Sequence, residues 1–503
     1  MKFNVLLLLA LFIFLKANAQ IYPIIPPDIP ASEMYQVWAN GEELFTGEAG
    51  SPRNGIGMYA FTTFDFSGSV TIKVKFKNAI KWLDIMPSAL GIESKEIDDY
   101  TFEFTLDKPE KLTVITNNNR KNTLHIITGH PEKDKPNPDD ANVSYFKAGK
   151  TYDVGILDLK DNQTLYIEGG AKLRGMVRVR DAKNVKILGR GMIDGTINKQ
   201  PEDKDREKDP FRLIYLENSE NVEIDGITLF NSLRWTIHPF NCTGLTISNI
   251  RIFNWDFGSD GIDISSCQDV TITNSFLRTN DDCIAVKALS FKMKDAHYPN
   301  PKIKNGDVKN ILVEKSVFWN MEYGNVFDIG FELRCDNISD IVFRDCDVLI
   351  QEGRGAVFSI HNGDYAKVEN ILWEDIRIEN ADGIRNHKLI DLAILFSIWS
   401  YDTYEFYGGP REFAYNDSWD NLLPVRPGTE KFHASHRGHI QNIRFKDIQV
   451  LDGKLPYSVL QGFDEEHMVK DIVFENITVS GKKINNAAEL KLTTQHAKNI
   501  SFE

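Results

Sequence analysis

Short stretches of alternating apolar and polar residues recur along most of this chain. Each recurrence consists of two short alternating stretches separated by a polar pair, as in "NVEIDGITLF" (221–230) and "DVTITNSFLR" (269–278). An Asn, Asp or Gly precedes the first apolar position each time, at Asn184, Asn221, Gly244, Asp269, Asn310, Asp340, Asn370, Asn442, Asp471 and Asn499. Alternation with a period of two indicates β-strands, and helical periodicity is nearly absent.

The spacing of these recurrences predicts a solenoid. Most steps are 23 to 41 residues long, and the longest runs from Asn370 to Asn442. A short repeat interrupted by occasional long loops is typical of stacked coils, each of which buries one side of its strands against its neighbours. We therefore expect an all-β protein with a right-handed parallel β-helix of roughly ten coils over residues 143–503.

The preceding segment predicts a different architecture. Residues 20–130 contain strand-like stretches separated by turn signals such as Asn40-Gly41, and they read as antiparallel strands. Their number and spacing favour a small N-terminal β-sandwich. The charged, proline-containing stretch 131–142 is the expected linker to the solenoid.

The first 19 residues have the pattern of a secretory signal peptide. Lys2 is followed by an apolar run from Val5 to Leu15 and by the small residues Ala17 and Ala19, so cleavage is expected before Gln20. No later stretch is apolar for long enough to predict a membrane span. The mature protein is expected to be exported, either periplasmic or secreted.

Composition narrows the classes of partner. The net charge of -14 disfavours nucleic acid as a general partner. Five cysteines are too few for a disulfide scaffold, so either buried thiols or a single disulfide is expected. No pattern in the sequence predicts a cofactor, and the oligomeric state is left open.

The longest step contains an insertion near 381–437 that is rich in aromatic residues. Nine of the residues from Phe396 to Trp419 are aromatic, including Trp399 and Tyr401. Aromatic faces stack on the apolar faces of sugar rings, so the insertion could form a substrate wall or lid. It could equally bury a small core of its own against the solenoid.

Aspartates interrupt the strand pattern at two points about one coil apart. "SDG" contains Asp260, and "NDD" contains Asp281 and Asp282. In a β-helix, residues one coil apart lie above one another, so these carboxylates should converge. Neighbouring acids repel, and at least one pKa should rise. A protonated acid beside an ionised one suits glycosidic cleavage, where one group protonates the leaving oxygen and the other activates water.

The residues "SDGIDIS" and "NDDCIAVK" resemble the aspartate core of glycoside hydrolase family 28, the polygalacturonase-like family. The chain is also similar to the related family 49 dextranases, which carry an N-terminal β-sandwich before the helix. The resemblance implies an inverting hydrolase with Asp260, Asp281 and Asp282 as its acid/base set and Asp282 as the proton donor. The partner would be a carbohydrate polymer or oligosaccharide.

Two departures from the family pattern argue against polygalacturonate as the substrate. Where the family has "G-H-G", this chain has Tyr323-Gly324-Asn325, and no "R-I-K" follows. The nearest comparable strand is 353–363. The remaining candidates for substrate binding are Lys287, Tyr323, Arg334, Arg354, His361, Trp399 and Tyr401. His433, His436 and His439 lack a carboxylate partner at ligand spacing, so no metal site is predicted.

Two other functions are compatible with the sequence. A lyase or dehydratase acting on uronic-acid oligosaccharides needs a base, a cation near the carboxylate and an acid, which Tyr323, His361, Arg354 and Lys287 could supply. A non-catalytic carbohydrate-binding solenoid could retain the aspartates as structure.

Overall fold

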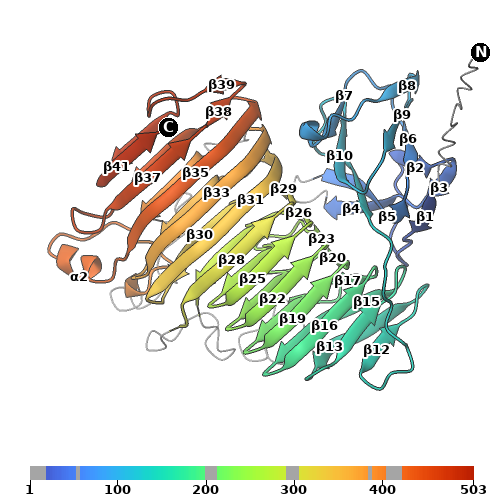
Figure 1. The fold of residues 1–503 in the computed structure, drawn as a ribbon, viewed down its shortest axis with the longest axis horizontal. Helices are drawn as coiled ribbons and strands as arrows, with labels where there is room; N and C mark the ends of the chain where they lie inside the picture. Colours follow the sequence, from blue (N-terminus) through green and yellow to red (C-terminus); the bar gives the residue numbers. More distant parts are fainter. Residues whose placement is uncertain (1–18, 52–56, 199–211, 290–304, 383–387, 404–421) are drawn as a thin grey trace, which may run out of the picture.

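A computed structural model describes residues 19–51, 57–198, 212–289, 305–382, 388–403 and 422–503. The predicted signal peptide therefore lies almost entirely outside the described residues. Two small sheets are formed by β1 to β11, and a 30-stranded sheet runs from β12 (Val143–Phe146) to β41 (Ala497–Phe502). Figure 1 shows these strands stacked into an elongated solenoid with the small sheets beside it. Within the described ranges, no helix is both long and apolar enough to cross a membrane.

The solenoid is built from three columns of parallel strands. The first column contains the recurring phrases of the sequence and consists of β12, β14 (Thr164–Ile167), β16 (Lys183–Gly189), β19 (Glu220–Asp225), β22 (Thr243–Ser248), β25 (Gln268–Thr273), β28 (Val308–Glu314), β31 (Asn337–Gln351), β33 (Lys367–Asn380), β35 (His439–Asp452), β37 (Val469–Glu475) and β41. Each of the ten recurrences contains one of its strands, from β16 onward. The predicted parallel β-helix is confirmed.

The second and third columns complete each coil. At the N-terminal end, β13 (Thr151–Leu159) and β15 (Lys172–Arg180) run through both columns. The second then contains β17 (Met192–Asp194), β20 (Thr228–Phe230), β23 (Arg251–Phe253), β26 (Phe276–Thr279) and β29 (Val317–Asn320), and it continues into the C-terminal halves of β31, β33 and β35 and into β38 (Thr478–Val479). The third consists of β18 (Ile214–Glu217), β21 (Ile237–Phe240), β24 (Ile262–Ser265), β27 (Ile284–Ala288), β30 (Phe327–Leu333), β32 (Ala356–Asn362), β34 (Lys388–Ile394), β36 (Tyr457–Gln461) and β40 (Leu492–Gln495).

The polar residue that opens each recurrence has a left-handed backbone. Every one of the ten, from Asn184 to Asn499, has a positive φ between 54° and 71°. Asn, Asp and Gly tolerate this conformation best, which explains why the position is restricted to them. A second positive-φ residue follows five positions later in each coil but the last, for example Asn274 after Asp269 and Asp447 after Asn442. Side-chain amides also bond from coil to coil, as between Asn442 and Asn370 at 2.6 Å.

The core of the solenoid is continuous and almost entirely apolar. Its strands place alternate side chains inward, so Ile and Val from successive coils stack. Aromatic rings stack in the same way: Phe343 lies 5.8 Å from Trp373, and Trp373 lies 4.9 Å from Phe445, between ring centroids. All five cysteines are buried free thiols, as one of the two sequence interpretations expected.

The N-terminal part consists of two sheets that enclose a shared core. One contains β1 (Gln20–Pro23), β4 (Gly47–Ser51), β5 (Gly57–Ser67), β7 (Leu83–Met86), β10 (Lys111–Thr116) and β11 (Leu124–Gly129); the other contains β2 (Tyr35–Ala39), β3 (Glu42–Leu44), β6 (Val70–Phe76), β8 (Lys95–Asp98) and β9 (Thr101–Leu106). Buried residues of both sheets pack together, which confirms the sandwich. One expectation was wrong: β11 pairs with β5 in parallel, because the chain crosses between sheets before it returns.

The sandwich packs on the second column of the solenoid. A separate apolar cluster joins Tyr59, Phe61 and Ile127 of the sandwich to Phe253 and Trp319 of the solenoid.

The third column carries a second difference from the sequence analysis. β34 lies inside the predicted insertion 381–437, yet it pairs with β32 and is a solenoid strand. The departure from the coil therefore begins after Ile394, and its described part includes the short helix α2 (Glu430–Ala434).

Candidate active site

The parallel register brings the aspartates of the opening motif together. Asp260 precedes β24, and the pair Asp281-Asp282 forms the turn between β26 and β27. Ile262 of β24 pairs with Ile284 of β27, so Asp260 and Asp282 occupy equivalent places on adjacent coils. The backbone N–H of Gly261 donates to the carbonyl of Asp282 at 2.8 Å. One carboxylate oxygen from each of Asp260, Asp281 and Asp282 lies within 4.8 Å of the other two. We call these three residues the aspartate cluster.

The next coil holds the carboxylate of Asp282 in place. Its Oδ1 accepts hydrogen bonds from the backbone N–H of Asn325 at 2.6 Å and from Nδ2 of Asn325 at 3.1 Å. Gly324 has φ 71°, and a Cβ there would lie 2.3 Å from the backbone nitrogen of Asp282. This tight contact explains the glycine. Asn325 thus fixes one oxygen of Asp282, while the other oxygen is left for a proton.

Burial and mutual repulsion raise the pKa values of the aspartate cluster. Burial raises the pKa of Asp281 to about 6. Burial, with the charges of the neighbouring aspartates, raises the pKa values of Asp260 and Asp282 well above the usual carboxyl range. Asp281 therefore ionises before the other two, and the cluster can hold a protonated acid and an ionised base at the same pH.

The third column contributes two buried groups that the sequence analysis did not select. Asp263 is fully buried, and burial raises its pKa to about 8. His238 lies one coil earlier, and burial keeps its pKa well below 6.5, so the imidazole is neutral. Asp263 was visible as the second aspartate of "SDGIDIS", whereas no local pattern marked His238.

Lys287 balances part of the negative charge from a buried position. Its ammonium donates to the carbonyl of Gly330 at 2.8 Å and pairs with Glu332 at 3.5 Å. Burial lowers its pKa, but the surrounding carboxylates outweigh that effect and hold the pKa above the ordinary lysine value. Lys287 is therefore an internal counter-charge and is only 5% exposed.

His361 was selected as a substrate-binding residue, but its position does not suit contact with substrate. It is fully buried, with Nε2 3.0 Å from Asp391 and Nδ1 3.4 Å from Asp328. Burial lowers its pKa, but the two aspartates prevail and raise it to about 10. Asn325 Nδ2 also donates to Asp328 at 3.3 Å. His361 thus reaches the aspartate cluster only indirectly, through a buried polar network.

The remaining candidates divide into two groups. Tyr323 lies beside the aspartate cluster, where its backbone N–H donates to the carbonyl of Asn280 at 3.0 Å, and the Arg354 guanidinium lies 5.6 Å from the Tyr323 ring centroid. The exposed ring of Phe257, which the sequence analysis did not select, lies 5.0 Å from that of Tyr323.

Arg334, Trp399 and Tyr401 belong to a different cluster. Arg334 pairs with buried Asp364 at 3.3 Å and donates to the carbonyl of Trp399. Tyr401 donates its backbone N–H to Asp364 at 2.7 Å. Six of the nine aromatic residues of the predicted wall, Tyr404, Phe406, Tyr407, Phe413, Tyr415 and Trp419, lie outside the described residues. For the rest, the small apolar cluster of Phe396, Ile398 and Leu423 supports the second interpretation, a core of the insertion itself.

The aspartate cluster and His433 are the two places where metal binding has to be considered. The aspartate cluster offers three carboxylates at a spacing that a divalent cation could also use, although Asn325 already engages one oxygen of Asp282. His433, by contrast, is buried and bonds to Asp402 at 2.6 Å. It anchors the base of the insertion.

Comparisons with known proteins find a family match for the part of the chain that carries the aspartate cluster. Residues 157–297 match the model of glycosyl hydrolases family 28. "Probable exopolygalacturonase B" of Aspergillus flavus is 25% identical over 222 residues, which cover 40% of this chain and 46% of that protein. "Probable polygalacturonase" of Vitis vinifera is 35% identical over 78 residues, 15% of this chain and 16% of that protein. The chain thus spans less than half the length of these curated relatives.

A solved structure extends the likeness to the whole fold. Dex49A from Penicillium minioluteum superposes with a TM-score of 0.53 and 13% identity, over 96% of each chain. At this identity the comparison supports the shared fold alone, including the sandwich before the helix. The coils that carry Asp260, Asp281 and Asp282 lie within the segment that matches the family 28 model, so the similarity that their sequence motif suggested is found.

Proposed function

We propose that this protein is an exported glycoside hydrolase that cleaves a polysaccharide or oligosaccharide with inversion at the anomeric carbon. The observation that carries the proposal is the convergence of three carboxylates within 4.8 Å on adjacent coils, those of Asp260 and Asp282 buried and that of Asp281 partly buried. Asp282 is the proton donor to the leaving oxygen, Asp281 deprotonates the attacking water, and Asp260 helps to hold that water. Export rests on the N-terminal sequence pattern.

The stereochemical part of the proposal comes from the family resemblance. Acid and base carboxyls are about 6.5–9.5 Å apart in most inverting enzymes and about 5–5.5 Å apart in retaining ones. The oxygens of the aspartate cluster are closer than the first range. Asp260 and Asp281 can bind the attacking water between them, which offers a way to place the water despite the short separation of the carboxylates. The anomeric form of the first product, observed by proton NMR before mutarotation, distinguishes the outcomes, and a retained anomer contradicts inversion.

The charges near the aspartate cluster favour a substrate other than polygalacturonate. Lys287 and Arg334 are buried and paired within the protein. Arg354 is the candidate cation beside the cluster, and its buried Nε has no hydrogen-bond partner in the described residues. One arginine can bind a sugar hydroxyl or a single carboxylate, but it does not replace both the Arg and the Lys of the family's "R-I-K".

Product analysis by mass spectrometry tests the activity. Purified protein incubated with neutral glucans, pectic and algal polysaccharides is expected to release fragments whose mass includes one added water per cleavage. Fragments that have lost water and absorb ultraviolet light as unsaturated uronates would identify a lyase instead. Binding without any cleavage would identify a non-catalytic solenoid.

The pH dependence of kcat/KM on a neutral oligosaccharide should follow the aspartate cluster. Activity is expected to fall as the pH decreases through about 6, because Asp281 then gains a proton and cannot accept one from water. A second fall is expected at higher pH, where Asp282, whose pKa burial raises well above the usual range, loses the proton it must donate. A profile that stays flat through pH 6 would rule out Asp281 as the base.

A further inference from the structure

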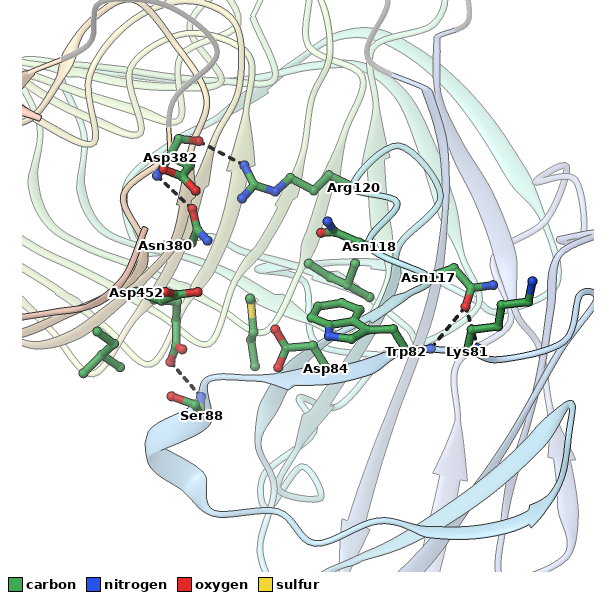
Figure 2. A pocket seen from close by; sticks show the side chains of 14 residues that line it. Lys81, Trp82, Asp84, Ser88, Asn117, Asn118, Arg120, Asn380, Asp382 and Asp452 are labelled. Atoms are coloured by element: carbon green, nitrogen blue, oxygen red, sulfur yellow. Dashed lines mark hydrogen bonds between the residues drawn. The ribbon is translucent and has the colours of Figure 1, made fainter. Parts of the chain in front are cut away.

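A pocket of about 710 Å³ lies between the sandwich and the solenoid. Figure 2 shows Trp82, Asp84, Asn117 and Asn118 on the sandwich side, facing Asn380 and Asp452 on the solenoid side. Ligand pockets commonly have this volume and occur at domain interfaces, with a few polar groups that converge on an apolar surface.

Trp82 gives the pocket an aromatic wall. The residue precedes β7, and its side chain is 44% exposed, which is unusual for an indole in this otherwise well-packed protein. Asn117 fixes the backbone on both sides: its N–H donates to the carbonyl of Trp82 at 2.8 Å, and its Oδ1 accepts from the N–H of Trp82 at 3.3 Å. An exposed indole on a fixed backbone offers a flat apolar face of the kind on which a sugar ring stacks.

The polar groups around Trp82 suit hydroxyl groups. Asp84 and Asp452 are close enough for repulsion to add to burial in raising the pKa of Asp84. Asn118, Asn380 and Arg120 also line the pocket, and Arg120 donates to the carbonyl of Asp382 at 3.1 Å. Carboxylates, amides and guanidinium groups each present paired acceptors or donors that can bond to neighbouring hydroxyls.

The charge of the lining selects among ligands. Four acidic residues (Asp84, Glu379, Asp382, Asp452) face two basic ones (Lys81, Arg120), which disfavours a uronate or a phosphate. Among the described residues, only the aspartate cluster brings three potential metal ligands within common reach, so the pocket acids do not form a comparable cation site. A neutral sugar fits both the indole and this charge.

The pocket is separate from the aspartate cluster but lies along the same column of strands. Thr279, two residues before Asp281, pairs with Asn320, which pairs with Gln351. Asn380 is on the next coil and Asp452 on the one after it. At about 4.8 Å per coil, the pocket lies roughly 14–19 Å from the coil of Asp281 along the solenoid.

We propose that this interdomain pocket is a second carbohydrate-binding site, which binds a neutral oligosaccharide segment by stacking on Trp82 and by hydrogen bonds to Asp84 and Asp452. This site goes beyond the proposed hydrolysis and does not depend on it. It would hold a polymer to the enzyme at a distance from the bond that is cleaved.

Calorimetric titration of the full chain with the Asp282→Asn substitution tests the site without turnover. The probes are linear neutral oligosaccharides of glucose, galactose and rhamnose, with oligogalacturonate as the anionic counterpart. At least one neutral probe is expected to bind about tenfold more weakly when Trp82→Ala is added. Trp82→Phe should restore most of the affinity, because the aromatic face remains.

Phe257→Ala is the matched control, since it removes an exposed ring beside the aspartate cluster instead. It should leave the Trp82-dependent binding unchanged. Trp82→Ala alone should leave kcat on a short substrate unchanged and raise KM on the polymer. The proposal is overturned if no neutral probe shows binding that depends on Trp82, or if oligogalacturonate binds there more tightly than the neutral probes.

Discussion

Replacing Asp282 with Asn is expected to lower kcat by about 10²–10⁴-fold, the usual contribution of a general acid. Asn preserves the shape of the side chain and can still meet Asn325, but it cannot deliver a proton to the leaving oxygen. The loss should be smaller for substrates with a good leaving group such as a nitrophenolate, because these need little protonation. Initial rates on both kinds of substrate measure the difference, and equal losses on the two would contradict the role of proton donor.

The same substitution should not destabilise the protein, which separates a catalytic effect from misfolding. Asp282 is buried beside like charges that raise its pKa, so a neutral amide removes repulsion. The thermal midpoint of Asp282→Asn is expected to equal or exceed that of the parent. Asp340→Asn is the matched control, because it makes the same chemical change at a positive-φ position where other coils carry Asn. Its kcat should stay within about twofold of the parent's, as for substitutions away from any functional group.

Replacing Asp65 with Ala is expected to cost about 3–5 kcal/mol of stability, because it leaves buried positive charge uncompensated. Asp65 lies on β5 and is 3% exposed. Its carboxylate is 2.7 Å from Nε of Arg190 and 3.6 Å from Nη2 of Arg251, both from the solenoid. Since Arg251 is fully buried, no water can replace the lost partner. Urea unfolding followed by tryptophan fluorescence measures the change in midpoint.

An exposed ion pair provides the control for Asp65. Asp153 pairs with Arg174 at 2.5 Å, but its side chain is 59% exposed. Asp153→Ala should therefore change stability far less than Asp65→Ala, because solvent screens an exposed pair. If Asp65→Ala costs as little as Asp153→Ala, the buried ion cluster does not hold the sandwich to the solenoid.

The repeat pattern predicted most of the fold because each coil repeats one local constraint. The ten polar positions from Asn184 to Asn499 all adopt the left-handed backbone that restricted their residue type. The register of adjacent coils then follows, and with it the convergence of Asp260, Asp281 and Asp282. The parallel pairing of β5 with β11 was missed because strand direction depends on which distant strands become neighbours.

The surroundings of the aspartate cluster were less predictable. His361 was predicted to bind substrate, but it is buried and pairs with Asp328 and Asp391, which come from two other strands of the third column. Arg334 was likewise predicted to bind substrate, but in the fold it forms an ion pair with buried Asp364. The pocket at Trp82 joins segments about 300 residues apart, so no local pattern could reveal it.

The two left-handed positions, five residues apart in every recurrence but the last, divide the solenoid into a constant edge and a variable one. Between these positions the chain has the same length in every coil, whereas the long excursions leave at the other corners, between β17 and β18, β27 and β28, and β34 and β35. Lengthening or exchanging a loop at those corners does not shift the pairing of the coils. Substrate preference in this scaffold can therefore diverge through loop replacement alone, while the stacked coils and the aspartates that they position stay unchanged.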